Sequence, residues 1–188
     1  PYELKNVDGD FKLEFPGKWS EATYWETVAL SAVNELYYRG LMKPLSRFEK
    51  DAVHSEGVLR LAGKIKSLKG KEGLTFCDFG TRRRLSRDWQ DYVVRTVAGE
   101  LPKHCLGTST THLAMKHALT PMGTSAHEMY MGLSGIMHDS DDEIRASHNR
   151  TLQDWWKQYG QGLSIALTDN YGTDFFFRDM TPEQARDW

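Results

Sequence analysis

Leu74-Thr75-Phe76-Cys77-Asp78-Phe79-Gly80 is the stretch that decides the fold. Its short apolar run ends at an aspartate and a glycine, which is typical of a buried strand that stops at a turn. Similar runs occur at Cys105-Leu106-Gly107, at Leu119–Met122 before Gly123, and at Leu163–Leu167, the clearest predicted strand. Helical patterns separate these runs. Short apolar strands that alternate with helices predict parallel β/α units and therefore an α/β fold.

The predicted helices have recognisable starts. Ser86 can cap one helix, and Ser140 and Glu143 form a capping-box pattern at another. Thr181-Pro182-Glu183-Gln184 also starts a helix well, yet the sequence stops at Trp188. About four strands would leave a sheet edge and an apolar face uncovered. We therefore expect a piece of a longer enzyme, or a chain that needs a partner.

The beginning of the chain has a different pattern. A loosely alternating stretch turns at Asp8-Gly9-Asp10, which predicts a hairpin. Thr23 and Glu26 form a capping-box pattern at the start of a predicted helix. A second helix is predicted from Arg47 to Leu68. Its expected buried stripe consists of Val53, Leu59, Leu61 and Ile65.

Composition limits the class of protein. The 188 residues are 39% hydrophobic and carry a net charge of −2, which argues against a general nucleic-acid binder. No apolar run is long enough to cross a bilayer, although Pro1 as first residue leaves room for a missing N-terminus. Cys77 and Cys105 fit a reducing, cytosolic compartment and show no metal-ligand spacing. Basic residues do cluster locally, at Arg82, Arg83, Arg84 and Arg87.

Polar loops follow the predicted strands, where α/β folds keep their sites. Phe79 beside a glycine offers a stacking face for a flat ligand, and the arginines from Arg82 offer forked donors to phosphate. A buried phenylalanine and a solvated helix start explain the same residues equally well. Gly107-Thr108-Ser109 can supply hydroxyl and N–H groups to a ligand, or simply cap the next helix.

A third loop, Pro121–Glu128, places the imidazole of His127 near a strand end, beside backbone N–H groups suited to anions. A lone histidine is more often structural or merely exposed. Met131 stands where a His-Glu-x-x-His zinc motif needs its second histidine, which excludes that reading. Asp169, after the last predicted strand, can bind a ribose hydroxyl or hydrated magnesium, or act only as a cap.

Taken together, these segments resemble the nicotinate phosphoribosyltransferase family. Each match is weak alone, but they occur in the family's order and cover nearly the whole chain. The matching stretches are Trp25–Val28 through Asn34–Arg39, Asp78–Arg84, Gly107–Ser109, Pro121–Glu128 and Leu167–Asp174.

The resemblance implies part of an irregular α/β barrel of the type II phosphoribosyltransferase kind, over residues 71–188. Residues 1–70 are expected to form a smaller N-terminal α+β portion. The implied reaction transfers phosphoribose from phosphoribosyl pyrophosphate, with magnesium, to the nitrogen of nicotinate in NAD salvage. ATP hydrolysis drives it through a phosphohistidine. A homodimer in the cytoplasm, with neither nucleic acid nor membrane as a partner, is also expected.

The resemblance also assigns roles to individual residues. His127 matches the phosphorylated histidine, Phe79 the aromatic that stacks on the pyridine ring, and Arg82 an arginine at the phosphoribosyl pyrophosphate site. Thr124 matches a position near nicotinate. Ser109 stands where nicotinamide-using relatives carry an acid, and a hydroxyl there suits a carboxylate substrate. These residues, with Asp169, are the predicted site.

Two family elements are absent from the 188 residues. One is the N-terminal segment that lends a tyrosine across the dimer, and the other is an Arg-His-Asp-Ser-Gly-type loop expected after Trp188. The piece alone is therefore expected to be inactive or nearly so. Two alternatives stay open: a relative that uses nicotinamide or quinolinate, and a non-catalytic fragment that only folds, dimerises or binds ligand.

Overall fold

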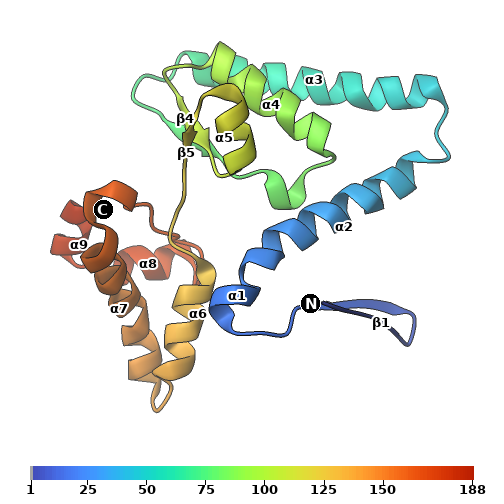
Figure 1. The fold of residues 1–188 in the computed structure, drawn as a ribbon. Coiled ribbons are helices and arrows are strands. Elements are labelled where there is room, and N and C mark those ends of the chain that lie inside the picture. The colour runs from blue at the N-terminus through green and yellow to red at the C-terminus, as the bar shows by residue number, and fades with distance from the viewer. Residues whose placement is uncertain (1) are drawn as a thin grey trace. The chain divides into compact units, whose positions relative to one another are not determined.

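The computed structural model describes residues 2–188. Contacts within the chain separate two compact units, Pro1–Met122 and Gly123–Trp188. Each unit is described by itself below, and Figure 1 shows the elements of both. The boundary predicted near residue 70 stays a prediction.

The first unit begins with the predicted hairpin. Strands β1 (Glu3–Val7) and β2 (Asp10–Glu14) pair in antiparallel register, with Val7 opposite Asp10. Asp8 and Gly9 make the two-residue turn, and both have positive φ angles, of 53° and 91°. Such angles are required by the turns that match the twist of a hairpin. The predicted hairpin is confirmed.

Three helices follow the hairpin: α1 (Trp19–Ala22), α2 (Tyr24–Met42) and α3 (Arg47–Lys69). The capping box predicted at Thr23 is wrong, because Thr23 is itself helical and its side chain makes no cap hydrogen bond. The Glu26 carboxylate instead pairs with Arg82. A complete capping box does occur at the start of the next helix, α3, where Ser46 and Glu49 form it.

The buried stripe predicted for α3 is only half right. Leu61 and Ile65 are buried and pack in one cluster with Val97 and Leu101, whereas Val53 and Leu59 are exposed. Only the C-terminal half of α3 therefore contributes to the described core.

A parallel sheet carries the candidate site of the first unit. Its strands β3 (Phe76–Asp78), β4 (Cys105–Thr108) and β5 (Thr120–Pro121) lie in the order β3-β4-β5. The 3₁₀ turn η1 (Thr81–Arg83) and helix α4 (Arg87–Glu100) connect β3 to β4, and α5 (Thr111–His117) connects β4 to β5. These β/α units confirm the predicted α/β class with parallel strands.

The second unit is helical. Its elements are α6 (His127–Ile136), α7 (Asp141–Tyr159), the 3₁₀ turn η2 (Gly160–Leu163), α8 (Thr173–Asp179) and α9 (Pro182–Asp187). At α9 the predicted cap is present as a complete capping box of Thr181 and Gln184. At α7 only half of the predicted capping box is described, with Ser140 Oγ accepting from the Glu143 N–H. The core contains Tyr130, Leu152 and Phe176.

The strand predicted at Leu163–Leu167 is wrong. Leu163 ends η2, and residues 164–167 are in no strand. This segment still makes two ladder-like contacts, since the Ser125 N–H donates to the Ile165 carbonyl and the Leu167 N–H to Ser125 Oγ (2.9 and 3.3 Å). An apolar run becomes a strand only where a neighbouring strand pairs with it, and the described second unit offers only Ser125.

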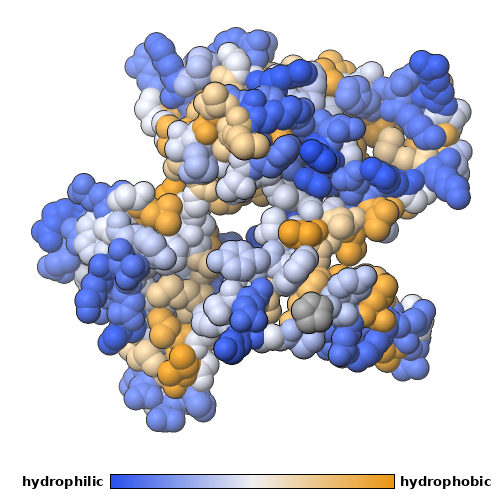
Figure 2. All heavy atoms as spheres, viewed as in Figure 1, coloured by the Kyte–Doolittle hydropathy of each residue, from blue (hydrophilic) through white to orange (hydrophobic). Residues whose placement is uncertain are grey.

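Large hydrophobic side chains remain exposed in both units. Figure 2 shows orange, strongly hydrophobic residues at the surface among hydrophilic ones. This agrees with the expectation of uncovered apolar surface. Within residues 2–188, no helix combines the length and apolarity needed to span a bilayer.

We predict that the second unit loses stability in mild acid because of His148. This residue is 2% exposed, and its ring packs against Tyr130, Phe175 and Phe176. Burial lowers the pKa of His148 below its ordinary value, because the charged ring would lose its hydration. As pH falls through the unfolded-state pKa of about 6.5, the unfolded state binds the proton more readily than the folded state.

The free energy of unfolding should therefore fall with decreasing pH below about 6.5, by up to about 1.4 kcal/mol per pH unit. Urea unfolding at pH 7.5 and 5.5 measures it. His148→Leu should reduce the difference, whereas exposed His138 changed to leucine should leave it in place. An equal pH difference in wild type and His148→Leu contradicts the prediction.

Candidate functional site

Two loops emerge side by side from the carboxyl end of the parallel sheet. Asp78 at the end of β3 lies opposite Thr108 at the end of β4, so Phe79 and Ser109 follow at adjacent strand ends. The Ser109 N–H donates to the Asp78 carbonyl at 2.8 Å, which continues the ladder past the strands. The sheet therefore brings these two predicted site residues together.

Asp78 organises both loops. Its Oδ1 accepts from the Gly80 N–H at 3.1 Å, and its Oδ2 accepts from Thr108 Oγ1 at 2.8 Å. Thr108 Oγ1 also accepts from the Thr110 N–H at 3.1 Å. Thr81 and Thr110 share a short hydroxyl contact across the two loops. The loop backbones are thus held by a continuous hydrogen-bond network.

The two side chains predicted to contact a ligand, Phe79 and Ser109, differ in solvent exposure. Phe79 is 47% exposed, so its ring does not belong to the core and its face is available to a ligand. Ser109 is half-buried. This arrangement favours the functional interpretation of the loop over a buried phenylalanine.

Arg82 is held by residues that sequence reasoning did not assign to the site. Its guanidinium forms an ion pair with Glu26 of α2, and its carbonyl accepts from the Asn34 side chain. Glu26 and Asn34 lie inside the stretches whose resemblance to the family is described above, and that resemblance was the only signal for them in the sequence. The pair keeps Arg82 at the loop while its side chain stays 40% exposed.

Glu35 provides a second acidic anchor for the arginine-rich turn. Its carboxylate accepts from the Arg87 N–H at 3.0 Å, and it lies 2.7 Å from Arg39 and 3.6 Å from Arg84. Although burial alone would raise the pKa of Glu35, these hydrogen bonds and charges lower it overall. An ionised Glu35 therefore neutralises part of the basic cluster and fixes the start of α4.

The second unit contains the other three predicted residues. His127 is the first residue of α6, and its Nε2 lies 3.0 Å from Asp169 Oδ1. The hydrogen bond from His127 lowers the pKa of Asp169. Thr124 lies three residues before His127, and its hydroxyl donates to the Ser125 carbonyl at 2.7 Å. The structure thus joins two residues, His127 and Asp169, that the sequence indicated separately.

The buried base of this turn fixes the histidine. Ser125 is 2% exposed, lies 3.4 Å from the buried Tyr130 hydroxyl, and bonds to Ile165 and Leu167 as described above. These contacts tie the turn before α6 to the segment that leads to Asp169. The His127–Asp169 pair therefore rests on an ordered scaffold, while both side chains remain accessible at 38% and 72% exposure.

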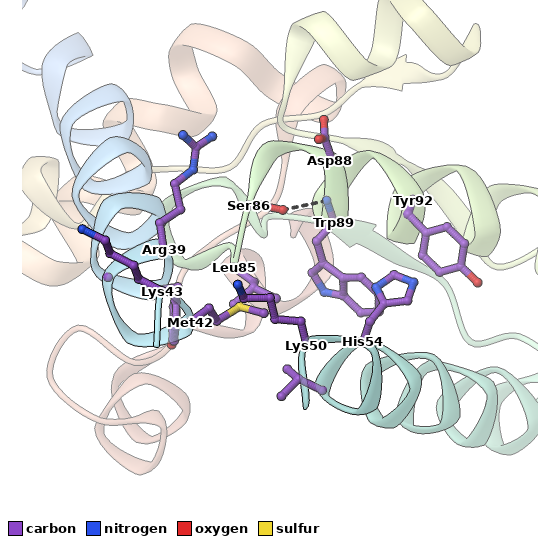
Figure 3. A pocket seen from close by; sticks show the side chains of 13 residues that line it. Arg39, Met42, Lys43, Lys50, His54, Leu85, Ser86, Asp88, Trp89 and Tyr92 are labelled. Carbon is purple, nitrogen blue, oxygen red and sulfur yellow. Dashed lines mark hydrogen bonds between the residues drawn. The ribbon is translucent and has the colours of Figure 1, made fainter. Parts of the chain in front are cut away.

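A separate cleft of about 660 Å³ lies between α2, α3 and α4 (Figure 3). Stacked Trp89 and Tyr92, with ring centroids 5.5 Å apart, form an aromatic wall together with His54. The predicted site residues do not line this cleft. A smaller cleft of about 370 Å³ does reach the strand-end loop, where Asp78 and Gly80 line it.

Comparisons with known proteins agree with the resemblance. The model of the nicotinate phosphoribosyltransferase (NAPRTase) family matches residues 74–188. A nicotinate phosphoribosyltransferase structure from Vibrio cholerae is 28% identical, with a TM-score of 0.73, and the match covers all of this chain and 43% of that one. One from Porphyromonas gingivalis is also 28% identical, with a TM-score of 0.74, over 99% of this chain and 45% of that one.

A putative nicotinate phosphoribosyltransferase from Saccharomyces cerevisiae is 24% identical, with a TM-score of 0.71, and supports the fold. That match covers all of this chain and 45% of the yeast chain. The chain thus spans less than half the length of these structures. Because the family model covers more than half of its residues, the chain belongs to the nicotinate phosphoribosyltransferase (NAPRTase) family.

Proposed function

We propose that this chain carries part of the site of an enzyme that joins nicotinate to phosphoribosyl pyrophosphate and forms nicotinate mononucleotide. Family membership supports this reaction. The observation that carries it is the parallel pairing of Asp78 with Thr108, which sets exposed Phe79 beside Ser109 at adjacent strand ends. An aromatic face next to a hydroxyl suits a flat, polar ring such as a pyridine carboxylate.

In the transfer step, the lone pair of the pyridine nitrogen forms a bond to the anomeric carbon of the ribose. The bond from that carbon to the pyrophosphate oxygen breaks, and its electron pair leaves with pyrophosphate. Positive charge develops on the ribose, so the protein needs to orient the ring and neutralise phosphates. Phe79 would orient the ring, Arg82 would bind phosphate, and Ser109 would lie near the carboxylate. For Thr124, the resemblance implies a position near nicotinate.

ATP coupling is proposed to use His127 and Asp169. When the Nε2–H of His127 donates to Asp169 Oδ1, the ring lone pair is on Nδ1, which makes that atom the nucleophile. Nδ1 would attack the terminal phosphorus of ATP, the bond to the bridging oxygen would break, and ADP would leave. Asp169 would stabilise the positive phosphorylated ring until water releases phosphate.

In this scheme magnesium would bind mainly through the substrate phosphates. Residues 2–188 contain no group of three or more His, Cys, Asp or Glu side chains that could hold a metal ion. Mg²⁺ commonly keeps several waters and binds through one or two carboxylates plus substrate phosphates. Asp169 is the one predicted residue that could contribute such a carboxylate, and magnesium would supply charge neutralisation of the leaving pyrophosphate.

The proposal is tested with the full-length chain, phosphoribosyl pyrophosphate and ATP. Nicotinate, nicotinamide and quinolinate are supplied separately, and each mononucleotide is quantified by chromatography. Nicotinate mononucleotide should be the main product. Preferred use of another pyridine would support that relative's activity instead, and the absence of any mononucleotide would support a non-catalytic role. Residues 1–188 alone should give little or no product.

Changing Ser109 to aspartate should switch the enzyme away from nicotinate. The new carboxylate would face the substrate carboxylate, and like charges in such contact cost several kcal/mol. We expect kcat/KM for nicotinate to fall at least about a hundredfold, while nicotinamide turnover is unchanged or higher. Ser109→Asn, which is isosteric with aspartate but neutral, is the control. Equal losses in both variants would show that size, not charge, matters at this position.

A homodimer and a cytosolic location are further proposals from the resemblance. Sedimentation of the full-length chain tests the first.

A further inference from the structure

Gln90 lies behind both strand-end loops and contacts each of them. It is 3% exposed, on the face of α4 that packs toward the sheet. Its Nε2 lies 3.2 Å from Asp78 Oδ2, 3.0 Å from Thr81 Oγ1 and 3.1 Å from Thr110 Oγ1. Its Oε1 lies 3.3 Å from an Arg84 guanidinium nitrogen. One buried amide therefore contacts four polar side chains, three of them in the segment from Asp78 to Arg84 and the fourth in the loop after β4.

The partners of Gln90 lie next to the two residues of the proposed ring site. Asp78 and Thr81 stand on either side of the Phe79-Gly80 dipeptide, and Thr110 directly follows Ser109. The Gly80 N–H donates to Asp78, and the Thr110 N–H donates to Thr108. A displacement of the Gln90 amide would thus move the backbone on both sides of the proposed ring site.

The amide chemistry is specific. Nε2 supplies two hydrogens to a cluster of oxygen acceptors that includes the Asp78 carboxylate. Glutamate at this position would bring a second carboxylate, without donors, to within hydrogen-bond distance of Asp78. Methionine would fill similar space but would remove one of the three hydrogen-bond donors to the half-buried Asp78 carboxylate, and losing a hydrogen bond to a charged group is costly.

We propose that Gln90 is a positioning residue that sets the spacing of the Phe79 and Ser109 loops and thereby the affinity for the pyridine ring. The role rests on the proposed function. Gln90 does not touch substrate; it acts through Asp78, Thr81 and Thr110. Misplacement of a binding group by about 1 Å can cost about a hundredfold in rate, so a shared anchor of two loops has a measurable effect.

The test compares Gln90→Met with Gln158→Met, a change of an exposed glutamine in α7. In the full-length chain, KM for nicotinate should rise about tenfold or more in Gln90→Met. ATP-dependent labelling of His127, which belongs to the second unit, should stay at the wild-type level. The Gln158 variant should change neither quantity. An unchanged KM, with or without parallel losses of kcat and labelling, overturns the positioning role.

A second measurement does not depend on catalysis. Amide hydrogen exchange at Gly80 and Thr110 should become at least about tenfold faster in Gln90→Met, while amides in the middle of α4 keep their protection. Faster exchange in a chain that never converts nicotinate would support the positioning role and contradict the proposed function. Unchanged exchange at both amides would contradict the positioning role.

Thr110→Val covers the case in which Gln90→Met fails to fold. It removes one acceptor from one loop and leaves the amide in place. Its KM for nicotinate should rise on its own. Where Gln90→Met does fold, the effects of the two changes in the double variant should combine to less than their product, because both act through the same hydrogen bond. An unchanged KM in Thr110→Val overturns the proposal.

Discussion

His127→Asn is expected to abolish ATP-dependent covalent labelling of the chain. Asparagine offers amide donors and an acceptor of comparable reach, but its nitrogen has no lone pair that can attack phosphorus. In the structure Nε2 of His127 lies 3.0 Å from Asp169 Oδ1, and an Nε2–H donated to Asp169 would leave the ring lone pair on Nδ1, the proposed nucleophile. The variant should therefore keep its fold and lose the phosphorylated intermediate.

Loss of the intermediate should also uncouple ATP from product formation. A coupling free energy of about 1–3 kcal/mol corresponds to an ATP stimulation of about 5- to 150-fold, and the variant should show none of it. Incubation with γ-labelled ATP followed by acid and alkali treatment measures the label, because phosphohistidine is lost in acid. His138→Asn, a change of an exposed histidine in the same unit, is the matched control.

Asp169→Asn separates the nucleophile from its orienting group. The amide can no longer stabilise a positive ring as a carboxylate does, so labelling should be slower than in wild type but still detectable. Equal labelling of wild type and His127→Asn would remove His127 from its proposed role, whatever the behaviour of Asp169→Asn.

The strand-end loops could be predicted from the sequence because local patterns specify them. An apolar run that stops at Asp78 or Gly107 is visible without knowledge of the partner strand, and both runs are confirmed as parallel strands. In each case short-range information and the tertiary structure favour the same conformation.

The wrong predictions share a cause in longer-range contacts. Leu163–Leu167 has a strand-like composition, but the described second unit gives it only Ser125 to pair with. Glu26 stands three positions after Thr23, where a capping box needs it. Its carboxylate instead pairs with the charged Arg82 of a distant segment, which is a stronger interaction than a capping hydrogen bond. Which of two competing partners a side chain takes cannot be read from its neighbours.

The supporting residues of the candidate site were missed for a related reason. Gln90 occupies an ordinary helical position, and nothing in its local sequence distinguishes it from an exposed glutamine. Only the packing of α4 against the sheet brings its amide to Asp78 and Thr110. Residues that contact a ligand follow strand ends and can be guessed, whereas residues that position them can come from any buried face.

Gly107→Ala is expected to destabilise the first unit severely. Gly107 lies in β4, between β3 and β5, with a φ of +156° that residues with a side chain rarely adopt. A methyl group there would lie 2.0 Å from the Thr120 carbonyl oxygen and 2.9 Å from Met122 Cγ. The Met122 side chain can move, but the Thr120 carbonyl belongs to the paired strand β5 and cannot retreat without breaking the sheet.

We expect a loss of about 3 kcal/mol or more in the free energy of unfolding, at the upper end for an overpacked site. This corresponds to a fall in Tm of roughly 6–12 °C for a chain of this size. Gly63→Ala is the matched control, because a methyl group there meets no atom within 4 Å in the middle of α3 and should raise helix stability slightly. The damage should also reach the site: Ser109 lies two residues beyond Gly107, so folded Gly107→Ala enzyme should bind nicotinate more weakly. A Tm within roughly 2 °C of wild type would show that β5 can yield to the methyl group and that the close approach of β4 and β5 does not hold the Ser109 loop in place.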